Sequence, residues 1–329
     1  MNSVSSPIVP MFELTPREVM EDVYFLPDFV ALHAYPDKID CLDEDNYRHY
    51  GAIRTIGSTG WTDIETPHGY GGPVSTSLSN LTDGLEAWKL RQRQYGRVAE
   101  LIRFHPCVNP EVFSSSLNYL ALNRMTVMID ISHNESHRLS HYSITTRQNI
   151  KKTRQKLSIR LLDKKEWRLL KYFYEQMLIR QHADARYYFC DNYYQEILAK
   201  EWCYSFIVEL DHQPLGAACF LSSTSPLAHY HLSGASDTGL RQRVHYLLID
   251  EACKYFSQRG KRWLHLGGGR STAPDDSLWL FKAQFSKIHS RFFIGGIIHD
   301  STTYKALGGA SDGLFLGYRA KLTTVPSST

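Results

Sequence analysis

In the second half of the chain, apolar residues follow two alternating spacings. Runs with the short spacing of strands lie at 205–210, 216–222, 229–233, 263–266 and 292–298. Apolar residues at helical spacing mark 166–181, 244–256 and 278–285, and a shorter helix is predicted from Asp191 to Ala199. The order after residue 200 is strand, strand, strand, helix, strand, helix, strand. This order predicts a mixed sheet flanked by helices.

The first half mixes shorter strand and helix patterns. Strands are predicted at 51–56, 97–104, 124–131 and 157–162. Thr82 or Asp83 is the expected cap of a helix that runs to about Tyr95, with Leu85 and Trp88 on one face. Residues 135–155 predict one long, polar, basic helix. No internal repeat is visible, so the pattern alone does not relate the two halves.

Composition favours a two-domain globular protein. The chain has 329 residues, of which 43% are hydrophobic and 22% are charged. The formal net charge of +3 is too small to indicate general nucleic-acid binding by itself. No C-x-x-C pair occurs, so the cysteines predict free thiols in a reducing compartment rather than a disulfide framework. These residues are Cys41, Cys107, Cys190, Cys203, Cys219 and Cys253.

The sequence predicts neither a metal site nor a membrane span. None of the 15 histidines stands at H-x-x-x-H with an adjacent glutamate. Residues 1–13 have no basic start and no long apolar stretch, so they do not form a signal peptide. No run approaches the roughly 18 apolar residues of a membrane helix. We therefore expect a cytoplasmic protein without a metal or redox cofactor and with a frayed tail at 323–329, while loose attachment to a membrane surface stays open.

The most informative stretch is the glycine-rich segment after the strand at 263–266. It reads W-L-H-L-G-G-G-R-S, and L-W-L-F-K-A-Q-F follows it as a short apolar helix with one lysine. A strand that ends in glycines exposes backbone N–H groups, which suit an acyl group or a phosphate. The alternative is a tight turn that binds nothing. A P-loop or a dinucleotide fingerprint fits poorly, because Arg270 and Ser271 follow contiguous glycines and Pro274 precedes the helix.

This stretch resembles a known family. The sequence L-H-L-G-G-G, followed by F-K-x-x-F, is similar to the second domain of the FemAB-like transferases. These are the peptidoglycan-bridge aminoacyltransferases and their relatives in the GNAT acyltransferase superfamily. Three further segments match the family in the same order along the chain. They are P-H-G-Y-G-G-P at 67–73 with R-F-H-P at 103–106, R-Q-N-I-K-K-T at 147–153, and Met177, Arg180, Ala183, Tyr187 and Phe189.

The resemblance implies an α+β protein of two tandem GNAT-like domains, each a mixed sheet flanked by helices. Residues 1–155 would form a degenerate acceptor-side domain, and residues 156–322 would form the donor-side domain. The implied activity is an N-acyltransferase that moves an acyl or aminoacyl group onto an amine of a cell-wall or surface-glycan precursor. The donor would be acyl-CoA or aminoacyl-tRNA, and the choice between them stays open.

GNAT-like domains hold a pyrophosphate on N–H groups at the start of the helix after the third strand, where the helix dipole is positive. Here that segment is 237–246, although Val244 or His245 stands where the superfamily has glycine. The alternative is that its arginines are solvated charges. The donor-binding residues that the resemblance implies are Arg241, Gln242, Arg243, Gly267, Gly268, Gly269 and Phe281.

Lys282 is the first candidate for a catalytic residue. It follows Phe281, so its side chain lies about 100° around the helix from the buried face, at the edge of the domain. There an ammonium could meet a developing oxyanion or a phosphate. The resemblance implies that the Phe-Lys pair binds or polarises the donor; the alternative is a plain surface lysine. His231, His265 and Asp237 are the candidates for the proton acceptor, and water is the alternative.

The resemblance also assigns an acceptor site in the first half. Its residues would be Tyr70, Gly71 and Gly72 in the glycine-rich loop and Arg103 on the nearby strand, where a guanidinium could pair with a carboxylate or phosphate. A structural arginine is the alternative for Arg103.

The segment 147–165 is strongly basic, with eight cationic residues against Asp163. It predicts either a solvated helix or a face that contacts the phosphates of tRNA or of an anionic lipid-linked sugar. The rival to the enzyme is therefore a non-catalytic module that binds an anionic glycan or nucleic acid through this segment.

Overall fold

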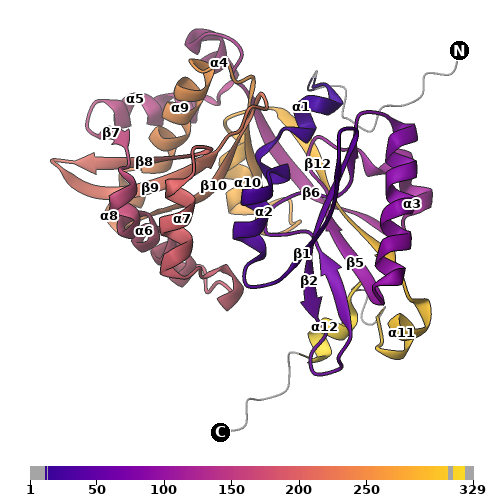
Figure 1. The fold of residues 1–329 in the computed structure, drawn as a ribbon. Coiled ribbons are helices and arrows are strands. Elements are labelled where there is room, and N and C mark those ends of the chain that lie inside the picture. The colour runs from indigo at the N-terminus through magenta and orange to yellow at the C-terminus, as the bar shows by residue number, and fades with distance from the viewer. Residues whose placement is uncertain (1–11, 13, 310–313, 323–329) are drawn as a thin grey trace, which may run out of the picture. The chain divides into compact units, whose positions relative to one another are not determined.

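The computed structural model describes residues 12, 14–309 and 314–322 (Figure 1). The predicted tail at 323–329 lies outside the described residues, as do residues 1–11 and 13. The chain forms two compact units, which are residues 1–124 with 291–329, and residues 125–290. These ranges differ from the predicted domains 1–155 and 156–322. The chain passes from the first unit to the second within strand β6 (Tyr119–Asp130) and returns within β12 (Ile288–Ile298), so no linker composition marks either crossing.

The first unit contains a mixed sheet. In the order β1-β2-β3-β5-β12, neighbouring strands are antiparallel except the parallel pair β3 and β5, and β4 pairs with β2. These strands are β1 (Ile39–Glu44), β2 (Tyr47–Thr55), β3 (Thr62–Glu65), β4 (Val74–Ser75) and β5 (Arg97–Arg103). The helices are α1 (Pro16–Met20), α2 (Pro27–Ala34), α3 (Leu78–Gln94), α11 (Ser301–Ala306) and α12 (Gly317–Leu322), with 3-10 turns η2 (Val23–Phe25) and η3 (Pro110–Ser116).

The cap of helix α3 is Ser77, five residues before Thr82 and six before Asp83, the two predicted caps. The side chain of Ser77 accepts a hydrogen bond from the N–H of Asn80 and caps the helix. Leu85 and Trp88 lie on its buried face, as predicted. Leu78 and Leu81 extend the helical spacing of Leu85 and Trp88 toward the N-terminus, so the spacing itself is compatible with the cap at Ser77.

The second unit contains a mixed sheet in the order β6-β11-β10-β9-β8-β7, in which only β10 and β11 are parallel. Its other strands are β7 (Ser158–Leu161), β8 (Cys203–Leu210), β9 (Gln213–Leu221), β10 (Leu227–Ala235) and β11 (Trp263–Gly268). The helices are α4 (Glu135–His141), α5 (Ile144–Arg154), α6 (Trp167–Arg180), α7 (Asp191–Ala199), α8 (Asp237–Arg241), α9 (Val244–Ser257) and α10 (Ser277–Ala283), with 3-10 turns η4 (Lys164–Glu166) and η5 (Ala185–Tyr187).

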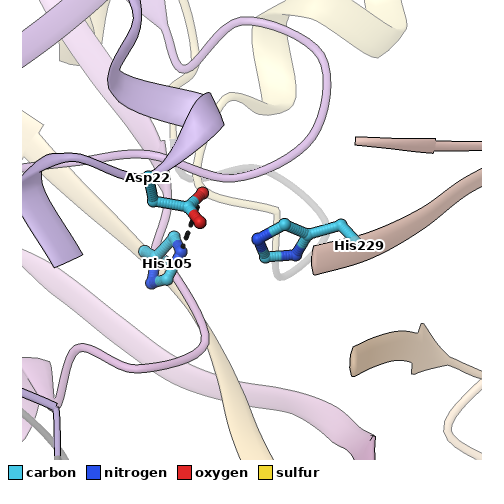
Figure 2. A group of neighbouring side chains, drawn as sticks. All are labelled: Asp22, His105 and His229. Atoms are coloured by element: carbon cyan, nitrogen blue, oxygen red, sulfur yellow. Dashed lines mark ion pairs between the residues drawn. The ribbon is translucent and has the colours of Figure 1, made fainter. Parts of the chain in front are cut away.

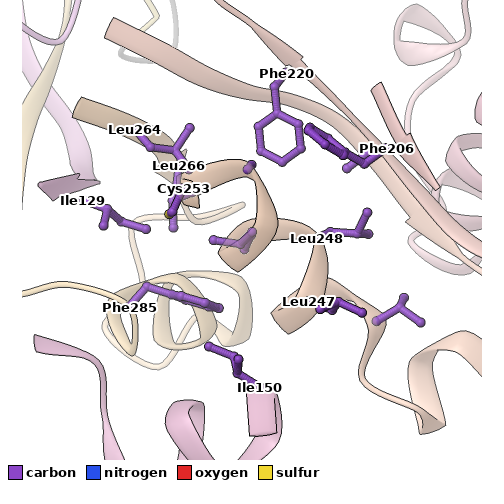
Figure 3. Packing of buried hydrophobic residues seen from close by; sticks show 14 of the residues in the cluster. Ile129, Ile150, Phe206, Phe220, Leu247, Leu248, Cys253, Leu264, Leu266 and Phe285 are labelled. Carbon is purple, nitrogen blue, oxygen red and sulfur yellow. The ribbon is translucent and has the colours of Figure 1, made fainter. Parts of the chain in front are cut away.

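The core of the second unit is one apolar cluster (Figure 3). Leu247 and Leu248 of α9 meet Phe285 after α10 and Ile150 of α5, and Phe220 of β9 joins them from the sheet. The apolar spacing of 244–256 predicts this buried face of α9. Burial of such side chains contributes about 1.5–3 kcal/mol each. The cluster therefore anchors α9 and α10, the two helices that carry the candidate site.

The predicted long helix at 135–155 is wrong, because two helices occupy this range. Helix α4 ends at His141, and Tyr142 is extended. The side chain of Ser143 then accepts a hydrogen bond from the N–H of Thr146 and starts α5. The basic segment 147–165 accordingly spans the end of α5, strand β7 and the turn η4 rather than one helical face.

The expected class, a mixed arrangement of sheet and helices, is confirmed in each unit. No helix among the described residues combines the length and the apolarity that crossing a membrane requires.

Candidate active site

The parallel strands β10 and β11 pair over a short distance and then part. Their register runs from Leu227 opposite Trp263 to His229 opposite His265. Beyond that point β10 stays with β9, and β11 stays with β6. Both of these pairings shift register near the same level, after Tyr230 in β10 and after His265 in β11. Such irregularities re-aim a strand, so they are the local cause of the separation.

Lys282 of α10 contacts both strands beyond the point where their pairing ends. Its Nζ donates a hydrogen bond to the carbonyl oxygen of Gly268 on β11 at 2.8 Å. The same Nζ lies 5.9 Å from the ring centroid of Tyr230 on β10, within cation–π range. The residue is only 7% exposed, so it is more deeply buried than the edge position predicted from the helix pattern. Lys282 is therefore not a plain surface lysine.

A short polar chain continues from Tyr230. Its hydroxyl donates to Oγ of Ser233 at 2.5 Å and lies 3.3 Å from Nδ1 of His245. Burial raises the pKa of Tyr230 to about 12, so the phenol is protonated at neutral pH. Burial, assisted by the charge of Arg180, lowers the pKa of His245 to about 4, so this imidazole is neutral. These groups can donate or accept hydrogen bonds but carry no charge beside Lys282 at neutral pH.

The loop after the glycines binds its own carboxylate. Asp276 accepts from the N–H groups of Arg270 at 3.0 Å and Ser271 at 2.9 Å, and it also caps α10 through the N–H of Trp279. Burial alone would raise the pKa of Asp276, but these hydrogen bonds lower it to about 2. Asp276 therefore occupies the N–H groups of Arg270 and Ser271, and donor binding by Gly267, Gly268 and Gly269 stays a prediction.

Glycine is required in this loop at two positions. Gly267 has a φ of +73°, which L side chains rarely adopt. A Cβ on Gly269 would lie 2.5 Å from a carboxylate oxygen of Asp276. The glycines therefore serve the turn and the aspartate, whereas Gly268 supplies the carbonyl that holds Lys282.

The three candidate proton acceptors lie in different surroundings. His265 is buried, and its Nδ1 lies 3.2 Å from Nδ1 of His229, at the last paired position of β10 and β11. His231 lies in the irregular part of β10, with Nε2 at 2.9 Å from the hydroxyl of Tyr193. Asp237 is largely exposed at the start of α8, 3.5 Å from Arg180. His265 thus lies at the strand separation, whereas Asp237 lies at the other end of β10.

The predicted donor-binding segment 237–246 is folded on itself. The N–H groups of Leu240, Gln242 and Arg243 donate to carbonyl oxygens of residues 236–240, and the N–H of Tyr246 donates to Arg243. Arg241 donates to Oγ1 of Thr238 at 2.9 Å, and Arg243 donates to Oδ1 of Asn149. Phe281 packs at 5.1 Å from the ring of Tyr246, so its ring belongs to the apolar core of the unit.

The predicted acceptor loop lies along the end of β5 in the first unit. Gly71 donates its N–H to the carbonyl oxygen of Arg103 at 2.8 Å and accepts from the N–H of His105 at 2.9 Å. Tyr70 packs edge-on against Tyr24 at 5.3 Å, and burial raises the pKa of its hydroxyl to about 12. Gly72 has a φ of +83°, and a Cβ there would lie 2.7 Å from Ile102.

The side chain of Arg103 is engaged in an ion cluster. It donates to the carbonyl oxygen of Thr66 at 2.6 Å and to a carboxylate oxygen of Glu65 at 3.3 Å. Glu65 also pairs with Arg319 at 2.8 Å and with Arg54 at 2.9 Å. Burial alone would raise the pKa of Glu65, but these guanidiniums lower it to about 2. Arg103 therefore has structural contacts, and its role at the acceptor site stays a prediction.

The basic segment is partly neutralised. Arg154 pairs with Glu135 at 2.6 Å and with Asp250, and Arg160 pairs with Glu166 at 2.7 Å and with Glu209 at 2.9 Å. These pairs tie α5 to α9 and β7 to β8. The local excess of positive charge is therefore smaller than the sequence suggested.

Sequence reasoning missed two buried polar groups of the first unit. Asp22 and His105 form one, with 3.4 Å between Oδ1 and Nε2 (Figure 2). Because Nδ1 of His105 accepts from the N–H of Cys107 at 3.2 Å, Nε2 carries the proton that faces Asp22.

The second buried polar group of the first unit is centred on Glu100. One carboxylate oxygen of Glu100 lies 2.7 Å from Nε2 of His49, and the other accepts a hydrogen bond from Nε1 of Trp88 at 2.7 Å. The only sequence signal for either polar group was the H-P motif after β5, which contains His105.

Comparison with solved structures identifies the fold of this chain. No protein-family model matches the chain, and no curated protein matches it in sequence. In structure, the chain has the fold found in FemX, so the resemblance to FemAB-like transferases is confirmed at the level of the fold.

FemX superposes with a TM-score of 0.71 at 12% identity, over 90% of this chain and 98% of FemX. The C-terminal domain of a putative lysylphosphatidylglycerol synthetase from Agrobacterium fabrum gives a TM-score of 0.59 at 14% identity, over 92% of this chain and 97% of that domain. L-PGS from Bacillus licheniformis gives a TM-score of 0.57 at 9% identity, over 92% of this chain and 95% of that protein.

Proposed function

We propose that this protein is an N-acyltransferase built from two GNAT-like domains, and that it transfers an aminoacyl group to an amine of a cell-wall or surface-glycan precursor. One observation carries the proposal. The ammonium of Lys282 is buried and held by Gly268 and by the ring of Tyr230, beyond the level at which β10 and β11 cease to pair. The FemX-like fold and the matching L-G-G-G and F-K motifs support the same assignment.

In this reaction the amine nitrogen attacks the carbonyl carbon of the donor ester. A new C–N bond forms, the C–O bond to the donor breaks, and the proton of the amine passes to the departing oxygen. Lys282 stabilises the negative charge that develops on the carbonyl oxygen. Its bond to Gly268 orients the ammonium before the substrate arrives, and an ammonium can donate three hydrogen bonds. His265, His231 and Asp237 stay candidates for a group that assists the proton transfer, and His265 lies nearest to the strand separation along the sheet register.

We propose aminoacyl-tRNA as the donor, with acyl-CoA as the alternative. A pyrophosphate needs N–H groups that point outward from the start of a helix. In the segment 237–246, the N–H groups of Gly239, Leu240, Gln242, Arg243 and Tyr246 bond within the segment and its cap. An ester-linked aminoacyl group needs no such pyrophosphate site. Donor binding by Arg241, Gln242 and Arg243 is therefore not part of this proposal.

The acceptor side of the proposal rests on the resemblance. The loop with Tyr70, Gly71 and Gly72 corresponds to the loop that shapes the acceptor site in the family. The side chain of Arg103 is bonded to Glu65 and Thr66, so we assign it a positioning role within that unit.

The test is a transfer assay with the full chain. The protein is incubated with tRNA charged with a mixture of amino acids, or with acetyl-CoA, together with amino sugars and peptide amines, and the products are examined for an added acyl mass. We expect an aminoacyl adduct that forms with charged tRNA and is lost in Lys282→Ala. A parallel arm supplies phosphatidylglycerol vesicles, because one structural neighbour is the C-terminal domain of a putative lysylphosphatidylglycerol synthetase. No adduct on any amine would overturn the proposal, and an adduct on phosphatidylglycerol alone would replace it with transfer to a hydroxyl group. Salt-sensitive RNA binding without turnover would support the rival binding module.

A further inference from the structure

His231 is the extra residue at an irregularity in β10. Its neighbours Tyr230 and Leu232 lie opposite consecutive residues of β9, so the register steps by one residue at His231. A bulge of this kind re-aims a side chain and is common beside active sites. It comes after His229, the last residue of β10 that pairs with β11. His231 therefore lies on the part of β10 that has separated from β11.

The side chain of His231 is held by Tyr193 of α7. Nε2 of His231 lies 2.9 Å from the phenol oxygen of Tyr193. The ring of Tyr193 is buried and stacks on Phe189, with 3.9 Å between the ring centroids and 14° between the planes. This packing fixes the position of the hydroxyl before a substrate binds. The contact can therefore orient the imidazole of His231, as the third group of a catalytic triad orients its base.

The phenol of Tyr193 keeps its proton at neutral pH. Burial raises the pKa of Tyr193 well above its ordinary value, and the nearby thiol of Cys219 raises it further. A phenol oxygen can donate its own proton and also accept another. Tyr193 thus brings a hydrogen-bonding group to His231 without a charge.

The direction of this hydrogen bond follows from the state of His231 after proton transfer. Both nitrogens of a protonated imidazole donate, so the oxygen of Tyr193 must then accept from Nε2 of His231. If the oxygen also accepts before the transfer, the contact does not reverse during the reaction, and no reorganisation is needed. Nε2 then carries the proton in the neutral ring, and Nδ1 is the nitrogen that takes the second proton.

The other two candidates for the proton acceptor have less suitable surroundings. His265 is 1% exposed, and its Nδ1 contacts His229. Asp237 lies at the other end of β10 and pairs with Arg180. His231 is half-buried, so it combines access for a substrate with a fixed orientation.

We propose that His231 takes the proton of the attacking amine through Nδ1, and that Tyr193 is the positioning residue that accepts from its Nε2–H. This inference rests on the proposed function, because it concerns the proton transfer of the same reaction. The amine nitrogen forms the new C–N bond, and its proton passes to Nδ1 of His231. As the C–O bond to the donor breaks, His231 gives that proton to the departing oxygen. The imidazole is thus neutral again after each turnover.

The test is a double-mutant cycle in the transfer assay, with the full chain, charged tRNA and the same amino sugars and peptide amines. His231→Gln should lower kcat about 10²-fold or more, within the usual range for general acid–base catalysis. Tyr193→Phe keeps the stacked ring and removes only the hydroxyl, so kcat should fall about 10-fold with the acceptor KM unchanged. The double variant should lose no more than His231→Gln alone, because Tyr193 acts through His231.

Tyr194→Phe is the matched control for the loss of a buried hydroxyl. Tyr194 is the next residue of α7 and is fully buried. Within the described part of the chain, its hydroxyl has no hydrogen-bond partner. Its removal should therefore leave kcat unchanged.

Nitrogen-15 spectra of the histidine rings test the tautomer without an activity assay. We expect the signals of His231, assigned by their loss in His231→Gln, to show the proton on Nε2 and to shift in Tyr193→Phe. A neutral ring with its proton on Nδ1 would overturn the inference. So would an unchanged kcat in Tyr193→Phe, or losses that add in the double variant. A wild type that forms no adduct contradicts the proposed function as well, whereas an adduct with unchanged kcat in Tyr193→Phe overturns this inference alone.

Discussion

Each unit of this protein buries a charged residue, and the two residues differ in what surrounds them. Glu100 in β5 is fully enclosed, and its carboxylate meets Trp88 of α3, His49 of β2 and, at 3.7 Å, Nε2 of His299 after β12. Lys282 in α10 retains 7% exposure and is held by a carbonyl oxygen and by an aromatic ring. The side chains around Glu100 therefore bind its charge from several elements, whereas the contacts of Lys282 orient an ammonium at a strand separation.

We expect this difference to separate a structural charge from a chemical one. Burial of a charge costs free energy unless hydrogen bonds and opposite charges compensate for it. Around Glu100 the donors come from elements far apart in the sequence, so the compensation also fixes how those elements pack. The ammonium of Lys282 is the charge that the proposed function uses during the reaction.

The largest expected effect is on the stability of the first unit. In Glu100→Ala, the N–H of Trp88 and the nitrogens of His49 and His299 would lose a buried partner. We expect the free energy of unfolding to fall by about 3–5 kcal/mol, the usual cost of breaking a buried charged pair. Urea unfolding measures this. Glu100→Gln, which keeps one acceptor for Trp88, should lose less, and a loss below about 1 kcal/mol in Glu100→Ala would contradict the structural role.

The next effect is on turnover. Lys282→Ala should lower kcat roughly 10²–10³-fold, the range seen when one donor to an oxyanion is removed. Lys282→Met, which preserves side-chain volume, should lower kcat by the same factor, because the charge rather than the packing is needed. Lys287→Ala is the matched control, since Lys287 is exposed just beyond the same helix. Steady-state kinetics and unfolding curves are measured together. Equal turnover in a folded Lys282→Ala protein would remove the proposed role.

The sequence predicted the second unit better than the site chemistry. The apolar spacing at 244–256 identified α9, because that signal is local, whereas the role that the F-K motif implies for Lys282 stays a proposal. Glu100 was not identified, because its partners come from residues 49, 88 and 299 and share no spacing with it. The contacts of Asp276 with the N–H groups of Arg270 and Ser271 were not predicted from the sequence. The sequence pattern therefore did not show which residues, far apart in the chain, compensate a buried charge.

Acid should affect stability through the neutral histidine beside Tyr230. The folded pKa of His245, about 4, lies below the value of about 6.5 in an unfolded chain. The unfolded state therefore binds this proton first as the pH falls. The stabilising contribution is complete above about pH 6.5 and is lost progressively as the pH falls toward about 4. Urea unfolding from pH 7 to 4 measures the loss, and His245→Gln should show a shallower decline. An equal decline in both proteins would show that other groups account for the acid sensitivity.

The smallest expected effect comes from Arg103, the cation that the motif assigned to the acceptor. In Arg103→Ala, Glu65 keeps Arg319 and Arg54, and the removed side chain is partly exposed, so the loss should be about 1 kcal/mol or less. Because its guanidinium is bonded to Glu65 and Thr66, kcat and the acceptor KM should change little. Thermal unfolding and kinetics on the same variant decide between the two roles. If the acceptor KM rises by a larger factor than kcat falls, Arg103 binds the acceptor. Arg103 and Lys282 would then both act in the reaction, at different steps.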